Sequence, residues 1–132
     1  MGTKLDVLGA IPLFASLSKR HRRKLLRGMH VFDYEPGHAI VRQGDEGETM
    51  FVVLEGEARV VRRGRTVGRL FAGDVFGEVS VFDTRPRTAT VQTVTQTTCL
   101  ALHRDELRKI LADEPKAAWA LLGTLAKRLR GD

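Results

Sequence analysis

Residues 76–91 read Phe-Gly-Glu-Val-Ser-Val-Phe-Asp-Thr-Arg-Pro-Arg-Thr-Ala-Thr-Val, the most informative stretch of the chain. Gly77 has no Cβ, so the backbone can come close to a bound molecule there. The residues after Gly77 can form a helical turn whose free N–H groups point at an anion. Arg87 adds a guanidinium that fits phosphate oxygens, and Glu78 adds a carboxylate that can accept hydrogen bonds from sugar hydroxyls. The stretch therefore predicts a site for a cyclic ribose phosphate.

Around this stretch the sequence has the pattern of many short strands. Runs rich in Val, Thr and Phe alternate with clusters of Gly, Asp, Glu and Pro at roughly eight-to-twelve-residue spacing. The expected strands cover residues 29–34, 39–42, 49–54, 58–62, 66–70, 88–94 and 98–103. Because short antiparallel strands must close their edges, the pattern favours a jelly roll.

Both ends of the chain have helical patterns. Ser18 is placed to cap a helix that runs through Arg27, and Gly28 is placed to end it. After His103 the apolar residues follow helical spacing, with one helix before Pro115 and a second after it. With 132 residues, the chain has the length of one domain. We expect a single domain with an N-terminal helical part at about 1–28, a β-roll at about 29–103 and C-terminal helices at about 104–130.

Composition narrows the class of protein. The net charge of +6 favours an anionic partner, and residues 19–27 hold six Lys or Arg and no acid. This basic run is interpreted as a solvated helix face rather than a nucleic-acid contact, because it lacks interleaved aromatics for base stacking. Cys99 is the one cysteine, so no disulfide can form within the chain, which suits a reducing, cytoplasmic location. Cys99 is interpreted as a small buried hydrophobe. The sequence contains no run of eighteen apolar residues, so no membrane-spanning helix is predicted.

Catalysis and metal binding are not expected. The four histidines lack the His-x-His and following Glu of metal-binding jelly rolls, so no metal ligand is assigned. No Ser-His-Asp or Cys-His arrangement accompanies a nucleophile motif, so no catalytic residue is assigned and the protein is expected not to be an enzyme.

Residues 76–91 resemble the phosphate-binding cassette of the cyclic nucleotide-binding domain family. The family's other recurring positions are matched in the same order by Pro12-Leu13-Phe14, Arg42-Gln43-Gly44-Asp45, residues 52–57 and Gly73-Asp74, so the resemblance runs from about Leu8 to Arg130. It implies a mainly β fold with flanking α-helices, an eight-stranded antiparallel jelly roll (double-stranded β-helix) with N-terminal and C-terminal lid helices.

The resemblance also implies a ligand, cAMP or cGMP, and a role for individual residues. Glu78 and the Gly77 backbone would hold the ribose 2′-hydroxyl, and Arg87 would hold the phosphate with help from the Ser80 and Thr88 amides. The implied ligand-binding set is Gly77, Glu78, Val79, Ser80, Arg87, Thr88 and Ala89. The candidate base pocket consists of Val60, Val67 and Leu70, with Trp119, Leu122 and Leu125 on the last helix as candidates for a lid. In the family, a hydroxyl residue at the position of Thr88 permits cGMP and does not exclude cAMP.

Other interpretations of these residues remain open. Glu78 and Arg87 can form a surface ion pair that ties two loops together, Ser80 and Thr88 can be ordinary turn hydroxyls, and the apolar candidates can be plain core. For the whole chain, the alternatives are a ligand-free jelly-roll scaffold for protein contacts and a nucleic-acid-binding protein that uses its basic surface.

The expected function is that of a regulatory sensor domain in which ligand binding moves the C-terminal helices. Many relatives are transcription regulators with a helix-turn-helix after the lid helix, and no such segment follows residue 132 in this sequence. DNA binding is therefore not expected within the chain, and its partner is an unidentified effector protein or a missing effector domain. A last helix of only about fifteen residues favours a monomer.

Overall fold

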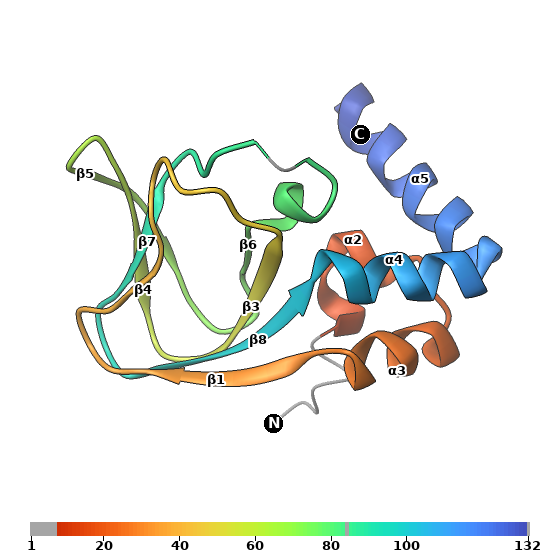
Figure 1. Ribbon diagram of the computed structural model, residues 1–132, viewed down its shortest axis with the longest axis horizontal. Helices are drawn as coiled ribbons and strands as arrows, with labels where there is room; N and C mark the ends of the chain where they lie inside the picture. The colour runs from red at the N-terminus through yellow and green to blue at the C-terminus, as the bar shows by residue number, and fades with distance from the viewer. Residues whose placement is uncertain (1–7, 84, 132) are drawn as a thin grey trace. The chain divides into compact units, whose positions relative to one another are not determined.

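The computed structural model describes residues 8–83 and 85–131. The chain divides into two compact units, which Figure 1 shows in full. The helical unit consists of Met1–Met29 and Asp105–Asp132, and the sheet unit consists of His30–Arg104.

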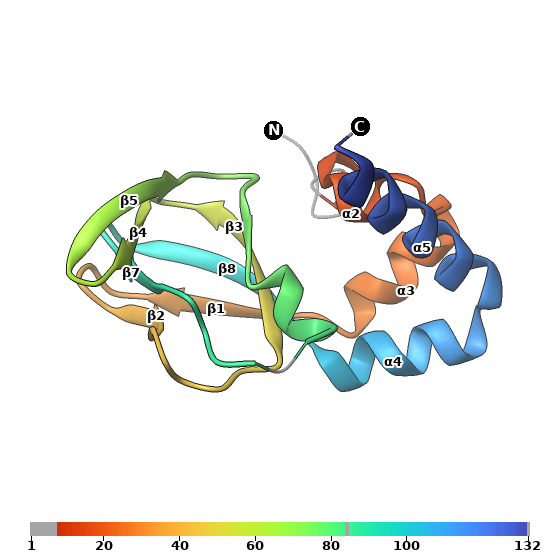
Figure 2. The same ribbon diagram turned by 90° about the horizontal axis from the view of Figure 1, so that it is seen from above.

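The sheet unit contains two four-stranded antiparallel sheets, visible in Figures 1 and 2. One sheet has the order β1 (His30–Tyr34), β8 (Thr97–His103), β3 (Thr49–Glu55) and β6 (Val75–Phe76). The other has the order β2 (Ala39–Val41), β7 (Thr90–Thr93), β4 (Ala58–Arg62) and β5 (Arg65–Leu70). The expected mainly β class with flanking helices is thus confirmed. Strands that are distant in the sequence lie side by side in both sheets.

The core of the sheet unit is apolar and draws on both sheets. It is formed by Phe51, Val53, Ala58, Phe76, Val91, Cys99 and Ala101. The rings of Phe51 and Phe76 stack with centroids 5.0 Å apart, across the pairing of β3 with β6. Burial raises the pKa of the Cys99 thiol to about 11, so the thiol stays protonated at neutral pH. Cys99 is therefore the small buried hydrophobe that the sequence predicts.

The segment between β6 and β7 is mostly irregular and carries the ligand-binding residues that the sequence predicts. It begins at Gly77, continues through the short 3₁₀ helix η1 (Glu78–Val81) and reaches β7 at Thr90. Strand β6 was missed by the sequence pattern because it has only two residues, too few for an alternation to show. The strand expected at 88–94 is shorter than predicted, because residues 88 and 89 belong to the irregular segment.

The helical unit contains α2 (Pro12–Ala15), α3 (Lys19–Arg27) and α5 (Pro115–Arg130), together with α4 (Arg104–Asp113), whose first residue belongs to the sheet unit. The Ser18 side chain accepts a hydrogen bond from the His21 N–H at 3.1 Å, so the predicted N-cap of α3 is confirmed. Gly28 follows as the predicted C-cap. No helix in the described part of the chain is long and apolar enough to cross a membrane.

Candidate functional site

A cavity of about 720 Å³ lies in the sheet unit, between the irregular segment and the strands. Val41, Val60, Leu70 and Val91 form its apolar wall, and these residues come from β2, β4, β5 and β7. Most of the polar wall comes from residues 77–89, which lie within the stretch that the sequence singles out. The cavity therefore combines an apolar surface with a few polar groups, as small-molecule sites do.

Arg87 lies in the polar wall and its guanidinium is held in place. Nη1 donates a hydrogen bond to the Ser80 Oγ at 2.9 Å, and Nη2 donates one to the Thr49 carbonyl oxygen at 2.9 Å. Desolvation lowers the pKa of Arg87, because partial burial penalises the charged form. An arginine pKa starts so high that the side chain remains a cation at neutral pH. The site therefore presents a fixed positive charge to the cavity.

Gly77 allows the backbone of η1 to come close to this cation. Its φ is 75°, and an added Cβ would lie 2.5 Å from Arg87 Nη1 and 2.9 Å from the Thr49 carbonyl oxygen. Both the backbone conformation and the close approach therefore require glycine. The Ser80 amide donates to the Gly77 carbonyl oxygen at 3.0 Å, so it is engaged in the turn. Donation from that amide to a phosphate stays a prediction and would need this bond to open.

Glu78 begins η1 and lines the same cavity. It forms no ion pair with Arg87, whose guanidinium bonds Ser80 and Thr49 instead. The interpretation of the two residues as a loop-tying ion pair is therefore not supported. Thr88 and Ala89 also line the cavity, while the side chain of Val79 lies outside the described part of the structure.

Two of the three apolar base-pocket candidates line the cavity and one does not. Val60 and Leu70 contribute to the apolar wall, but Val67 is 55% exposed and is absent from it. The pairing of β4 with β5 passes from Val60 and Gly68 to Val61 and Thr66, which leaves Val67 as the extra residue of a bulge. Gly68 pairs with Val60 and lies two positions from Leu70, so ordinary alternation along β5 places the Val67 side chain on the opposite face from the Leu70 side chain. The structure therefore does not bring Val67 to the cavity with Val60 and Leu70.

Arg62 is a cavity residue that the sequence reasoning missed. It follows Val60 by two positions on β4, so both side chains share one face of the strand, and both line the cavity. The Arg62 Nε donates to the Thr88 carbonyl oxygen at 3.2 Å. Strand alternation from Val60 is the sequence signal that predicts it, but a base-pocket pattern of apolar residues does not include an arginine.

An ion pair between Asp83 and Arg85 borders the cavity. The Arg85 Nη2 lies 2.6 Å from Asp83 Oδ2, and both residues line the cavity wall. Hydrogen bonds from Arg85 lower the pKa of Asp83. Arg62 and Arg87 are the other two arginines of the cavity wall, and Glu78 is its other carboxylate.

The lid candidates belong to the helical unit. Trp119 is 75% exposed and Leu122 is 56% exposed on α5, whereas Leu125 is half-buried. Their contact with a base stays a prediction. Among the residues that the structure describes, no three His, Cys, Asp or Glu side chains gather as a metal site would require.

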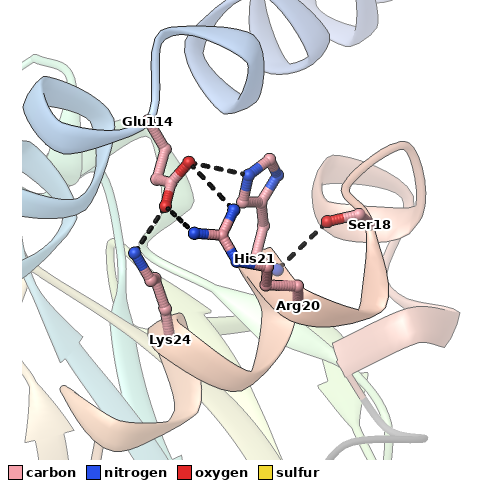
Figure 3. A network of polar contacts seen from close by, with 5 residues as sticks. All are labelled: Ser18, Arg20, His21, Lys24 and Glu114. Atoms are coloured by element: carbon pink, nitrogen blue, oxygen red, sulfur yellow. Dashed lines mark hydrogen bonds and ion pairs between the residues drawn. The ribbon is translucent and has the colours of Figure 1, made fainter.

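The basic run on α3 is partly neutralised within the helical unit, as Figure 3 shows. Glu114 follows α4, and its carboxylate lies 3.2 Å from Arg20 Nη2 and 3.1 Å from His21 Nε2. Lys24 Nζ forms a further ion pair with the same carboxylate. The sequence predicts a solvated helix face at residues 19–27, and these ion pairs give three of its basic side chains a structural partner in place of a nucleic acid.

Comparisons with known proteins agree with this architecture. Residues 31–114 match the model of the cyclic nucleotide-binding domain. The chain is 31% identical over 130 residues to the CRP-like cAMP-activated global transcriptional regulator of Mycobacterium tuberculosis (strain ATCC 25618 / H37Rv), which covers 95% of this chain and 58% of that relative. The chain therefore spans little more than half the length of this curated relative.

Two solved structures are similar along nearly the whole chain. The N-terminal domain of a transcriptional regulator from Streptomyces coelicolor A3(2) is 35% identical with a TM-score of 0.90, over 96% of this chain and 92% of that one. The catabolite activator protein of Thermus thermophilus is 33% identical with a TM-score of 0.76, over 92% of this chain and 59% of that one. Since the family model also matches more than half of the 132 residues, the chain belongs to the cyclic nucleotide-binding domain family.

Proposed function

We propose that this chain binds cAMP or cGMP in the cavity of the sheet unit and acts as a regulatory sensor domain. The observation that carries the proposal is the guanidinium of Arg87, which Ser80 and Thr49 hold at the wall of a cavity that Glu78 also lines. A fixed cation and a carboxylate in one cavity match the two ends of a cyclic ribose phosphate, the phosphate and the sugar hydroxyl.

Each residue of the cavity wall has a proposed role. Arg87 binds the phosphate, with the amides of Ser80 and Thr88 as further donors, and Glu78 with the Gly77 backbone binds the ribose 2′-hydroxyl. Val79 and Ala89 complete the segment around the sugar phosphate. Val60 and Leu70 contact the purine, which fits their place in the apolar wall. Trp119 or Leu122 on α5 covers the base.

The proposed regulation is a movement of the C-terminal helices on ligand binding. Such a movement requires that the ligand bind the closed arrangement more tightly than the open one, because a ligand with equal affinity for both shifts nothing. The exposed apolar side chains of Trp119 and Leu122 supply a reason for closure, since a bound purine would remove part of their surface from water.

The fold and the biological setting complete the proposal. The strand orders β1-β8-β3-β6 and β2-β7-β4-β5 support an eight-stranded jelly roll, and we propose that the helices and the roll form one domain. The protein works in the cytoplasm without catalysing a reaction. The proposed partner is an effector domain or an effector protein, which the printed name of the curated relative, a transcriptional regulator, supports.

Thermal unfolding with cAMP, cGMP and 5′-AMP tests the proposal, after the protein has been unfolded and refolded to remove any carried ligand. A ligand at a hundred times its dissociation constant adds about 2.7 kcal/mol, which raises Tm by on the order of 10 °C for a domain of this size. We expect a rise with a cyclic nucleotide and none with 5′-AMP. If no nucleotide raises Tm, the chain is a ligand-free scaffold and the proposal is wrong.

A further inference from the structure

Gly47 lies in the loop between β2 and β3, directly against the guanidinium of Arg87. A Cβ added at Gly47 would lie 2.5 Å from Arg87 Nε and 2.7 Å from Arg87 Cζ. Real Cβ atoms essentially never approach a heavy atom so closely, so any other residue at this position would displace the side chain of Arg87. The guanidinium of Arg87 therefore occupies the space that a side chain at Gly47 would fill.

The same loop also holds the main chain of Arg87. The Gly44 N–H donates to the Arg87 carbonyl oxygen at 2.9 Å, and the Arg87 N–H donates to the Asp45 carbonyl oxygen at 2.8 Å. The loop thus contacts Arg87 at two points. It forms two hydrogen bonds with the Arg87 backbone, and the missing side chain of Gly47 leaves room for the Arg87 guanidinium. Gly77 borders the guanidinium as well, since its added Cβ would meet Nη1.

The two glycines differ in the reason for which glycine is needed. Gly77 has a φ of 75°, so any substitution there would also strain the backbone. Gly47 has no such φ, and its backbone is open to other residues. Gly47 is therefore needed only because a side chain there would collide with Arg87. A substitution at Gly47 tests this collision without straining the backbone.

We propose that Gly47 is a positioning residue for phosphate binding, because its missing side chain sets where the guanidinium of Arg87 lies. This inference rests on the proposed function. In Gly47→Ala, the flexible end of Arg87 moves aside while the loop keeps its backbone. The guanidinium then loses its geometry toward Ser80 and Thr49, and a phosphate meets a displaced cation.

Isothermal titration with cAMP and with cGMP tests the proposal on Gly47→Ala, with Gly68→Ala as the matched control. Gly68 also lies outside the left-handed region, and its added Cβ would meet only Val60, at 4.0 Å. We expect Gly47→Ala to weaken binding on the order of tenfold, the loss of one charge-assisted hydrogen bond. Gly68→Ala should bind as the unmodified protein does. Equal affinities for all three proteins would overturn the proposal.

A double-mutant cycle with Arg87→Ala separates positioning from a general effect on the fold. If Gly47 acts through Arg87, Gly47→Ala should change neither affinity nor Tm in the Arg87→Ala background. The Tm values of the unmodified protein, the two single variants and the double variant give the same cycle without nucleotide. The double variant should fold even if Gly47→Ala alone does not. Additive losses in Tm would contradict a contact between the two residues. If Arg87→Ala itself leaves affinity unchanged, the proposed function fails, and the ligand-free cycle still reports on the contact.

Discussion

Hydrogen bonds with four other residues hold Arg87 in position. Its guanidinium bonds the Thr49 backbone and the Ser80 side chain, and its backbone bonds Gly44 and Asp45. Fixing a long side chain before the ligand arrives reduces the entropy that binding must offset. A single arginine in a sequence says nothing of this preorganisation, since every partner except Ser80 is about forty residues away.

Arg87→Ala should weaken cyclic nucleotide binding by about thirty-fold to several-thousand-fold, since removing a buried charge opposite another costs roughly 2 to 5 kcal/mol. Isothermal titration measures the loss. Arg65→Ala is the control, because Arg65 is an exposed residue of β5 that lies outside the cavity wall. An unchanged affinity in Arg87→Ala would remove Arg87 from the phosphate site.

Thr88 is expected to favour cGMP without excluding cAMP in the proposed site. Thr88→Ala should lower the affinity for cGMP more than the affinity for cAMP, because the hydroxyl can meet the guanine amino group. Arg62→Ala should act in the same direction, since an arginine at this wall can donate to the O6 and N7 acceptors of guanine. Competition binding with both nucleotides measures the ratio. Equal losses for the two nucleotides would contradict these base contacts.

At the scale of elements, Glu114 connects α3 to the junction between α4 and α5. The hydrogen bond from Lys24, with that from His21 and the nearby charge of Arg20, lowers the pKa of Glu114 against the opposing effect of desolvation. A carboxyl whose pKa is lower in the folded state stabilises the fold above its unfolded pKa, and loses that contribution as the pH falls through the folded pKa. The contacts therefore stabilise the helical unit at neutral pH (Figure 3).

Glu114→Gln should lower Tm at pH 7, and the difference from the unmodified protein should shrink as the pH falls below about 4. Thermal unfolding of both proteins across this pH range provides the measurement. Asp113→Asn removes a neighbouring carboxylate that is exposed, and it should have little effect on Tm. A difference between Glu114→Gln and the unmodified protein that stays constant with pH would show that the charge of Glu114 is not the cause.

At the scale of the whole molecule, the proposed coupling connects a cavity in the sheet unit to α5. Trp119 reports on it directly, because it is the single tryptophan of the chain and is 75% exposed. If ligand binding brings α5 over the base, tryptophan emission should shift to shorter wavelength with cAMP or cGMP and stay constant with 5′-AMP. A constant emission during saturation by a nucleotide that raises Tm would exclude Trp119 as the lid residue.

The sequence alone determined the local features of this protein. Turn residues at regular intervals placed seven of the strands to within about two residues, and capping chemistry placed α3 from Ser18 to Gly28. These features depend on neighbours along the chain, so a linear pattern records them. Most of the residues that the cassette at 76–91 predicts for ligand binding line the cavity, because glycine, carboxylate and arginine have distinct chemistry that a sequence records directly.

Only the tertiary structure decided the features that depend on distant segments. Strand β6 exists because Val75 and Phe76 pair with β3, and two residues carry no period of their own. The cavity itself also depends on distant segments, because its wall combines residues of β2, β4, β5 and β7 with the segment after β6. Gly47 reads as a turn residue in the sequence, but the structure places it against Arg87, forty residues further along the chain. Such contacts are set by strand register, which is a property of paired segments rather than of either segment alone.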